Sequence, residues 1–193
     1  MDLGLRDKVA LVTGGSIGIG HATALALARE GADVAICARG IDRLERAAAA
    51  IRAETGRTVL AVGADMTRPP DIEALVTATV AELGGVDILV NNAVSSTEAP
   101  FMEMTDEAWM GHISVKIMGY IRCARQAVPH MRRRGGGRIV NIGGLAARRA
   151  GDLTASNGLN NSAVANLSKH LADQVAGDGI LVNCVHPGPT RTP

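Results

Sequence analysis

The fold of this chain is decided by the stretch Val9-Ala-Leu-Val-Thr-Gly-Gly-Ser-Ile-Gly-Ile-Gly20. Its first half reads as an apolar strand, and its glycines follow that strand at a spacing that suits a tight turn into a helix. Gly14 permits the turn, Gly18 lets the backbone approach a phosphate closely, and Gly20 lets the helix lie against the sheet. Because a helix that begins here points its free N–H groups at the turn, the stretch predicts a binding site for the pyrophosphate of a dinucleotide.

The residues around the glycines supply the context that such a motif requires. An Ala- and Leu-rich helix, His21–Glu30, follows the turn directly. A glycine-rich loop with a purely structural role is the alternative, but such a loop needs neither the preceding strand nor the following helix. We therefore expect Ser16, Ile17 and Ile19 to contact the cofactor together with the three glycines.

Length and composition limit the remaining possibilities. The chain has 193 residues, of which 47% are hydrophobic, and a formal net charge of +1. This predicts one compact dinucleotide-binding domain over residues 1–193, with enough apolar residues for a core. The near-neutral charge gives no electrostatic footprint for nucleic acid. No apolar run reaches the length of a membrane span, and the N-terminal residues do not resemble a signal peptide.

The cysteines predict neither disulfides nor a metal site. The chain has three, Cys37, Cys123 and Cys184, and their spacing is not that of metal ligands. All three fall within predicted strands or helices, so we interpret them as reduced core or surface residues of a cytoplasmic protein.

Strands and helices alternate along the chain, which predicts a doubly wound α/β fold with a parallel sheet and helices on both faces. The expected strands are Val9–Thr13, Asp33–Ala38, Thr58–Gly63, Ile88–Asn91, Arg138–Ile142 and Ile180–Val185. The expected helices are Ile19–Glu30, Asp42–Thr55, Asp71–Leu83, Asp106–Arg133 and Ser156–Ala176. Glycines follow most of the predicted helices, where they accept the left-handed conformation of a helix end.

The end of the second predicted strand indicates which dinucleotide is bound. A carboxylate there would bond the 2′-hydroxyl of an adenine ribose and repel a 2′-phosphate. Ala38 has no carboxylate, whereas the adjacent Arg39 offers a guanidinium group suited to phosphate, and Ser16 can add a hydroxyl. These residues favour NADP(H) over NAD(H). The alternative is that Arg39 is an ordinary surface charge.

Several motifs, in this order along the chain, resemble the short-chain dehydrogenases/reductases. The resemblance extends over nearly the whole chain and is carried by Thr13–Gly20, Asp65-Met66, Asn91-Asn92-Ala93, Pro187-Gly188 and Thr192. It implies a Rossmann-type fold, a nicotinamide dinucleotide as cofactor and a small molecule as substrate. It also implies cofactor contacts, which would come from Asp65 and Met66 near the adenine, from Asn92 and Ala93 along the cofactor, and from Pro187, Gly188, Thr190 and Thr192 near the nicotinamide.

The chain departs from the family at the four residues that normally carry the proton relay. Alignment on Gly119 places Lys116 at the family's helix asparagine, and alignment on the fifth strand places Gly144 at the serine that polarises the carbonyl. Asn157 and Asn161 stand at the tyrosine and the lysine. The family's tyrosine donates a proton because a neighbouring ammonium lowers its pKa. An asparagine amide does not titrate near neutral pH, so Asn157 can hydrogen-bond a carbonyl but cannot act as the acid.

The lysine and asparagine of the family appear in exchanged positions, Lys116 on one helix and Asn161 on the other. The long lysine side chain can carry its ammonium back to the nicotinamide ribose or to Asn161. The alternative is that Lys116 points into solvent. The only tyrosine, Tyr120, lies one helical turn beyond Lys116, and a core or interface role is the expectation for it.

Two functions are therefore compatible with the sequence. One is an NADP(H)-dependent oxidoreductase that acts on a small carbonyl or alcohol with a non-standard active site, in which Lys116, Asn157 and Asn161 are the candidate catalytic residues. The other is a catalytically silent dinucleotide-binding protein that acts as a sensor or as a subunit of an oligomer. Because the chain stops at Pro193, the C-terminal part of the family fold that shapes the substrate pocket is expected to be absent.

The two long predicted helices also indicate self-association, since the corresponding helices pack against their symmetry mates in the family. They carry more apolar side chains than one face of a sheet can cover, including Ile113, Ile117, Ile121, Val164 and Leu167. A homodimer or homotetramer is therefore expected.

Overall fold

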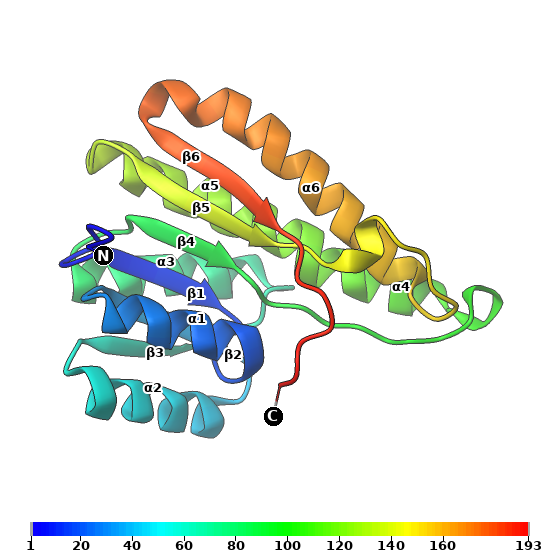
Figure 1. The fold of residues 1–193 in the computed structure, drawn as a ribbon, viewed down its shortest axis with the longest axis horizontal. Helices are drawn as coiled ribbons and strands as arrows, with labels where there is room; N and C mark the ends of the chain where they lie inside the picture. The colour runs from blue at the N-terminus through cyan, green and yellow to red at the C-terminus, as the bar shows by residue number, and fades with distance from the viewer. Residues whose placement is uncertain (1, 193) are drawn as a thin grey trace.

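The computed structural model describes residues 2–192 and consists of one parallel sheet with helices on its two faces (Figure 1). The strands are β1 (Val9–Thr13), β2 (Asp33–Ala38), β3 (Val59–Gly63), β4 (Ile88–Asn91), β5 (Gly137–Ile142) and β6 (Ile180–Val185). The α-helices are α1 (Gly18–Arg29), α2 (Ile41–Thr55), α3 (Pro69–Leu83), α4 (Asp106–His112), α5 (Gly119–Arg133) and α6 (Ala155–Val175). The expected fold class is confirmed, and the predicted ends of most elements differ from the observed ones by one or two residues.

The strand order in the sheet is β3-β2-β1-β4-β5-β6, and every neighbouring pair is parallel. The order reverses between β1 and β4, which pair through Ala10 and Ile88, Leu11 and Leu89, and Val12 and Val90. Ligands bind at the carboxyl ends of the strands at such a reversal in open α/β sheets. The fold therefore directs attention to the ends of β1 and β4.

Two apolar clusters cover the two faces of the sheet. On one face α1 and α2 pack over β1, β2 and β3, and small side chains such as Ala24 and Ala28 let α1 approach closely. On the other face α3, α5 and α6 share a cluster that includes Leu75, Ala127 and Val175. The near-continuous burial of β1, β2 and β4 follows from this double coverage.

The predicted helix Asp106–Arg133 is correct in position but is not one regular helix. A π-helical segment, Ile113–Met118, separates α4 from α5. The apolar spacing along this region is also that of an α-helix, so the sequence pattern does not reveal the wider turn. Short π-helical segments are frequent at functional sites, and this one contains Lys116.

The surface of the long helices corrects one part of the expected interface. Val164 is fully buried within the chain, so its inclusion among the surface apolar residues was wrong. Its side chain faces the interior because it lies on the same side of α6 as the buried Asn160, Asn161 and Ser168. The other four residues of that set, Ile113, Ile117, Ile121 and Leu167, are partly exposed. Among residues 2–192, no helix combines the length and apolar character needed to cross a membrane.

Candidate functional site

The glycine turn after β1 has the geometry that its sequence predicts. Gly14 and Gly18 have φ angles of +69° and +60°, a region that side chains rarely adopt. A Cβ atom at Gly20 would lie 2.2 Å from the carbonyl oxygen of Gly14. Helix α1 begins at Gly18, and the extended residue before it, Ile17, has no side-chain cap for the first-turn N–H groups. The turn therefore excludes side chains where the chain passes close to itself and presents backbone donors to an anion.

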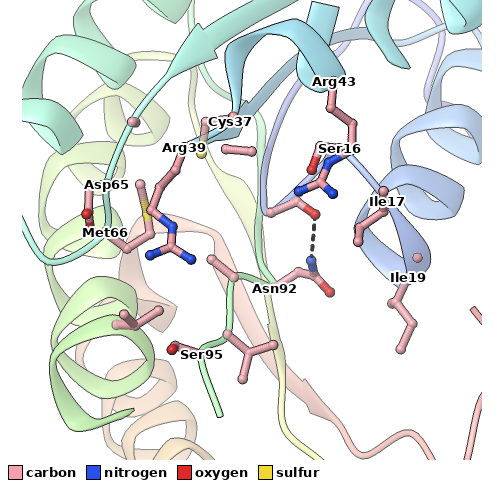
Figure 2. A pocket seen from close by; sticks show the side chains of 18 of the residues that line it. Ser16, Ile17, Ile19, Cys37, Arg39, Arg43, Asp65, Met66, Asn92 and Ser95 are labelled. Atoms are coloured by element: carbon pink, nitrogen blue, oxygen red, sulfur yellow. Dashed lines mark hydrogen bonds between the residues drawn. The ribbon is translucent and has the colours of Figure 1, made fainter. Parts of the chain in front are cut away.

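Hydrogen bonds from the end of β4 hold this turn in place. The Nδ2 atom of Asn92 donates to the carbonyl oxygens of Thr13 and Gly14 at 2.9 and 3.2 Å, and Figure 2 shows the bond from Asn92 to the turn. In return, the hydroxyl oxygen of Thr13 accepts from the backbone N–H groups of Asn92 and Ala93 at 2.9 and 3.1 Å. Asn92 thus shapes the turn as well as bordering the cleft beside it.

A cleft of ≈ 380 Å³ opens over the turn. The predicted residues that line it are Gly14, Ser16, Ile17, Gly18, Ile19, Arg39, Asp65, Met66, Asn92, Ala93 and Thr192. Gly20 lies beneath the turn, against the Gly14 carbonyl. Three predicted residues near the C-terminus, Pro187, Gly188 and Thr190, are not among the lining residues. Most of the residues predicted to hold the cofactor are therefore brought together in one cleft.

Arginine side chains border the end of the cleft beside β2. Arg39 follows that strand directly, and Arg43 comes from the first turn of α2. In Figure 2 the Arg43 guanidinium lies next to Ser16, and Arg39 extends on the side of Asp65 and Met66. Arg43 was not predicted from the sequence, because its participation depends on how α2 returns toward the glycine turn. Arg39 precedes α2, so no helical spacing relates the two arginines.

Asp65 lies opposite Arg39 and is held as a carboxylate. Its Oδ1 atom accepts hydrogen bonds from the backbone N–H and the hydroxyl of Thr67, both at 2.8 Å. The backbone hydrogen bond from Thr67 is the main cause that lowers the pKa of Asp65, and the positive charge of Arg39 lowers it further. This end of the cleft therefore combines one fixed anion with two cations.

Lys116 lies inside the protein at the other end of the site. It is only 7% exposed, and its Nζ atom donates to the carbonyl oxygen of Gly143, just beyond β5, at 3.2 Å. Burial lowers the pKa of the Lys116 ammonium to about 8. The interpretation of Lys116 as a solvent-directed side chain was therefore wrong. Its sequence neighbour Val115 lines the cleft, whereas Lys116, Asn157 and Asn161 are not among the lining residues.

Of the two partners expected for Lys116, Asn161 makes no hydrogen bond with it within residues 2–192, and the nicotinamide ribose stays a prediction. Asn161 is also buried, and its Oδ1 atom has no hydrogen-bond partner within residues 2–192. A Cβ atom at Gly144 would lie 2.5 Å from the Nδ2 atom of Asn161. The Asn161 amide therefore fills the space into which a side chain at position 144 would project. Lys116 donates its hydrogen bond to the Gly143 carbonyl oxygen instead.

Asn157 and Tyr120 complete the set of candidates at the reaction end. Asn157 is half-buried in the first turn of α6. Tyr120 is buried, and its hydroxyl donates to the carbonyl oxygen of Ile142 at 3.0 Å. Burial raises the pKa of the tyrosine far above its ordinary value, so this phenol is held in its neutral form. The interpretation of Tyr120 as a core aromatic is confirmed.

Two histidines near this region were not singled out from the sequence. The Nδ1 atom of His186 lies 3.0 Å from the carbonyl oxygen of Gly144 and 3.2 Å from its backbone nitrogen. His112, at the end of α4, is buried between Thr97 and Ser156. Neither residue belongs to a spacing pattern, so only their positions in the fold reveal them.

Comparison with known proteins agrees with these observations. The sequence profile described as short chain dehydrogenase matches residues 8–193. A rabbit (Oryctolagus cuniculus) protein named dehydrogenase/reductase SDR family member 4 is 35% identical over 189 residues, which are 97% of this chain and 72% of that protein.

Solved structures give the same result. The L-sorbose reductase of Gluconobacter frateurii, complexed with NADPH and L-sorbose, superposes with a TM-score of 0.97 at 39% identity, over 100% of this chain and 73% of that one. A short chain dehydrogenase of Burkholderia cenocepacia in complex with NADP gives a TM-score of 0.92 at 36% identity, over 97% and 76% of the two chains. The chain therefore belongs to the short-chain dehydrogenase/reductase family, as an oxidoreductase that uses NAD(P), with NADP(H) the cofactor of these close structural neighbours.

Proposed function

We propose that this protein transfers hydride between NADP(H) and a small carbonyl or alcohol, and that Lys116 replaces the family's tyrosine as the proton donor. One observation carries the proposal: Lys116, the residue after the cleft-lining Val115, is buried beside the end of β5, and burial lowers the pKa of its amine to about 8. A general acid is most effective when its pKa lies near the working pH. Lys116 meets this condition, whereas the asparagines at positions 157 and 161 cannot titrate.

The chemistry requires two transfers to the carbonyl group. NADPH, when bound, would supply the hydride for the carbonyl carbon. The Lys116 ammonium then gives a proton to the carbonyl oxygen, and the resulting neutral amine regains its proton from solvent. In the reverse direction the neutral amine accepts the proton of the alcohol. The amides of Asn157 and Asn161 would orient the oxygen by hydrogen bonding.

The residues around the cleft fit NADP(H). The left-handed backbone at Gly14 and Gly18 and the first turn of α1 suit a pyrophosphate, since within residues 2–192 no side chain caps the first-turn N–H groups of α1. Arg39 and Arg43 would bind the 2′-phosphate together with Ser16. In the same scheme Asp65 and Met66 border the adenine, and Asn92, Ala93 and Thr192 border the rest of the cofactor. Pro187, Gly188 and Thr190 are assigned to the nicotinamide end by resemblance alone.

A polyhydroxy ketone is a reasonable first substrate class to test. A neighbour that superposes over the whole of this chain is an L-sorbose reductase complexed with NADPH and L-sorbose. Within residues 2–192 the Oδ1 atom of Asn161 is buried without a hydrogen-bond partner, and it would accept from a substrate hydroxyl group if the side chains around it moved aside.

A catalytically silent NADP(H)-binding protein is the second candidate, because the Lys116 ammonium is already engaged. Its hydrogen bond to the Gly143 carbonyl would have to be exchanged for one to a substrate oxygen during turnover. If that exchange does not occur, the cleft binds a dinucleotide without chemistry.

A hydride-transfer screen separates the two candidates. NADPH consumption would be followed with ketoses, cyclic ketones and aldehydes, with NADPH binding measured by fluorescence on the same sample. Binding with turnover supports the oxidoreductase, and binding without turnover on every substrate supports the silent protein.

The control is the variant that carries Lys116→Asn, Gly144→Ser, Asn157→Tyr and Asn161→Lys together, which rebuilds the family's relay on this scaffold. It should reduce carbonyls if the fold and the cofactor site are intact. Gly144→Ser is placed in this variant only together with the change at Asn161, whose amide now fills the space.

We also propose that the protein is a homodimer or homotetramer. The partly exposed apolar residues Ile113, Ile117, Ile121 and Leu167 on the long helices support association through these helices. The mass in solution, measured by light scattering at micromolar concentration, tests this, and a monomer would contradict it.

A further inference from the structure

His112 is a buried titratable side chain that the proposed proton transfer does not use. It is 3% exposed at the C-terminal end of α4, and both ring nitrogens have partners. The Nε2 atom lies 2.5 Å from the backbone nitrogen of Thr97, and the Nδ1 atom contacts the hydroxyl of Ser156. The imidazole thus joins three segments: the loop of residues 92–100 after β4, helix α4, and the first turn of α6.

These partners determine where the imidazole carries its proton. A backbone N–H can only donate, so Nε2 must be an unprotonated acceptor for Thr97. In the neutral ring Nδ1 then carries the hydrogen and donates to the Ser156 hydroxyl. Protonation of Nε2 would set two N–H groups against each other and break the contact with Thr97.

Two of these three segments, the loop of residues 92–100 and the first turn of α6, border the proposed site. In the loop, Ala93, Val94 and Ser95 line the cleft two to four residues before Thr97. In α6, Ser156 directly precedes Asn157. The position of the imidazole therefore fixes the distance between the cleft wall and the helix that carries the reaction-end asparagines.

We propose that neutral His112 is a positioning residue that holds the loop of residues 92–100 against α6, and that acid releases this loop and weakens ligand binding. We call the contact of His112 with Thr97 and Ser156 the His112 bridge. The effect on substrate rests on the proposed function, whereas the effect on the loop does not.

The surroundings of the ring agree with this direction. Burial lowers the pKa of His112. The titratable groups on the elements around it are Glu98 in the loop, Glu103 in the 3₁₀ turn that follows, Asp106 and Glu107 on α4, Lys116 on the π-helical segment, and Arg148, Arg149 and Asp152 before α6. In the part of the chain that the structure describes, the ring makes its hydrogen bonds with Thr97 and Ser156 and no ion pair with these groups. The bridge is therefore closed at neutral pH and opens as pH falls below the ordinary histidine pKa of 6.5.

Hydrogen exchange at the Thr97 amide measures whether its hydrogen bond to His112 is formed. In the unmutated protein this amide should be protected at neutral pH and should lose roughly tenfold in protection on acidification, the loss expected for one hydrogen bond. His112→Leu should show the low protection at every pH. His112→Gln keeps an acceptor near the position of Nε2 that does not titrate, so it should stay protected in acid.

The same variants test the effect on the site. For His112→Leu and for the milder Ser156→Ala, we expect NADPH dissociation constants and substrate KM values to rise roughly three- to tenfold, with kcat changed less. His112→Gln should restore most of the affinity. His170→Gln, at an exposed position on α6, is the matched control and should behave as the unmutated protein.

The outcomes distinguish this proposal from the proposed function. Unchanged Thr97 protection in His112→Leu overturns the bridge, as does a pH-dependent protection that persists in His112→Gln. If the loop responds as expected but no substrate is turned over, the bridge stands and the oxidoreductase proposal fails.

Discussion

The cofactor end of the cleft and its reaction end are built on neighbouring strands of one sheet, and they relate differently to the family pattern. At the cofactor end the glycines cannot change independently, because a Cβ atom at Gly20 would collide with the backbone of Gly14. At the reaction end the constraint is between side chains, since the Asn161 amide occupies the space beside Gly144. A clash with the backbone, as at Gly20, admits no larger residue. A clash with a side chain, as at Gly144, can be relieved if the neighbouring side chain of Asn161 becomes smaller. We propose that this difference lets the residues aligned with the family's relay change together while the glycine turn cannot change.

The largest effect should come from Lys116, because the proposed reaction depends on it alone for the proton. Lys116→Met keeps the length of the side chain but removes the ammonium. Loss of a general acid reduces turnover by about 10²–10⁴-fold. The measurement is kcat for whichever ketone the screen identifies, with NADPH affinity measured in parallel. Turnover that survives in Lys116→Met would show that another group donates the proton.

If Lys116 is the proton donor, the rates of carbonyl reduction and alcohol oxidation should depend on pH in opposite directions. Carbonyl reduction needs the ammonium, so its rate should fall as pH rises through about 8, the pKa of Lys116. Alcohol oxidation needs the neutral amine, so its rate should rise through the same pH. Both transitions should be missing in Lys116→Met if any activity remains. Profiles that are flat around pH 8 in the unmutated protein would argue against Lys116 as the acid.

The free energy of unfolding tests the lowered pKa of Lys116 without any measurement of activity. In the unfolded chain the lysine has its ordinary pKa of 10.5, and burial lowers the pKa to about 8 in the folded protein. Between these values the unfolded state binds more protons, so the free energy of unfolding should rise with pH across this window, by about 1–3 kcal/mol. Denaturant unfolding at several pH values measures it. Lys116→Met should remove this rise.

The two ends of the cleft also differ in how much of them the sequence could predict. The turn and the strands were predictable because glycine spacing and apolar runs are local signals. The π-helical segment at Ile113–Met118 was not, since its apolar pattern is shared with an α-helix. The acceptor of Lys116 and the participation of Arg43 depend on how distant segments pack, which no local pattern in the sequence reveals.

The next largest effect concerns the cofactor end. If Arg39 and Arg43 bind the 2′-phosphate, Arg39→Ala and Arg43→Ala should each reduce the preference for NADPH over NADH by about 1.5–3 kcal/mol, the range for hydrogen bonds to charged groups. Arg46→Ala is the matched control, because Arg46 lies on the same helix as Arg43 but does not line the cleft. Dissociation constants for the two dinucleotides decide the matter. Equal affinities in the unmutated protein would contradict the assignment.

A smaller effect on stability tests whether a side chain at position 144 and the Asn161 amide compete for the same space. The backbone at Gly144 is extended, with φ 173°, so alanine meets no backbone strain there. Its Cβ atom would nevertheless lie 2.5 Å from Asn161 Nδ2, so Gly144→Ala should lower the free energy of unfolding by about 1–3 kcal/mol. In an Asn161→Ala background the same change should cost less, with a coupling of at least about 1 kcal/mol. Gly177→Ala, in open space, is the control. Additive losses would show that the two positions do not share this volume.

The smallest effect should come from Tyr120, and it separates a structural phenol from a catalytic one. Its hydroxyl donates to the Ile142 carbonyl from a buried position, and burial raises its pKa, so the group is neither accessible nor acidic enough to donate a proton in the reaction. Tyr120→Phe keeps the ring and removes only this hydrogen bond, which should lower the free energy of unfolding by about 0.5–1.5 kcal/mol. The kcat and its pH profile should not change. Because Tyr120 is the only tyrosine in the chain, a kcat that falls to the level of Lys116→Met would mean that a phenol is used after all, reached by a movement of α5. An unchanged kcat would leave Lys116 as the proposed proton donor at the reaction end.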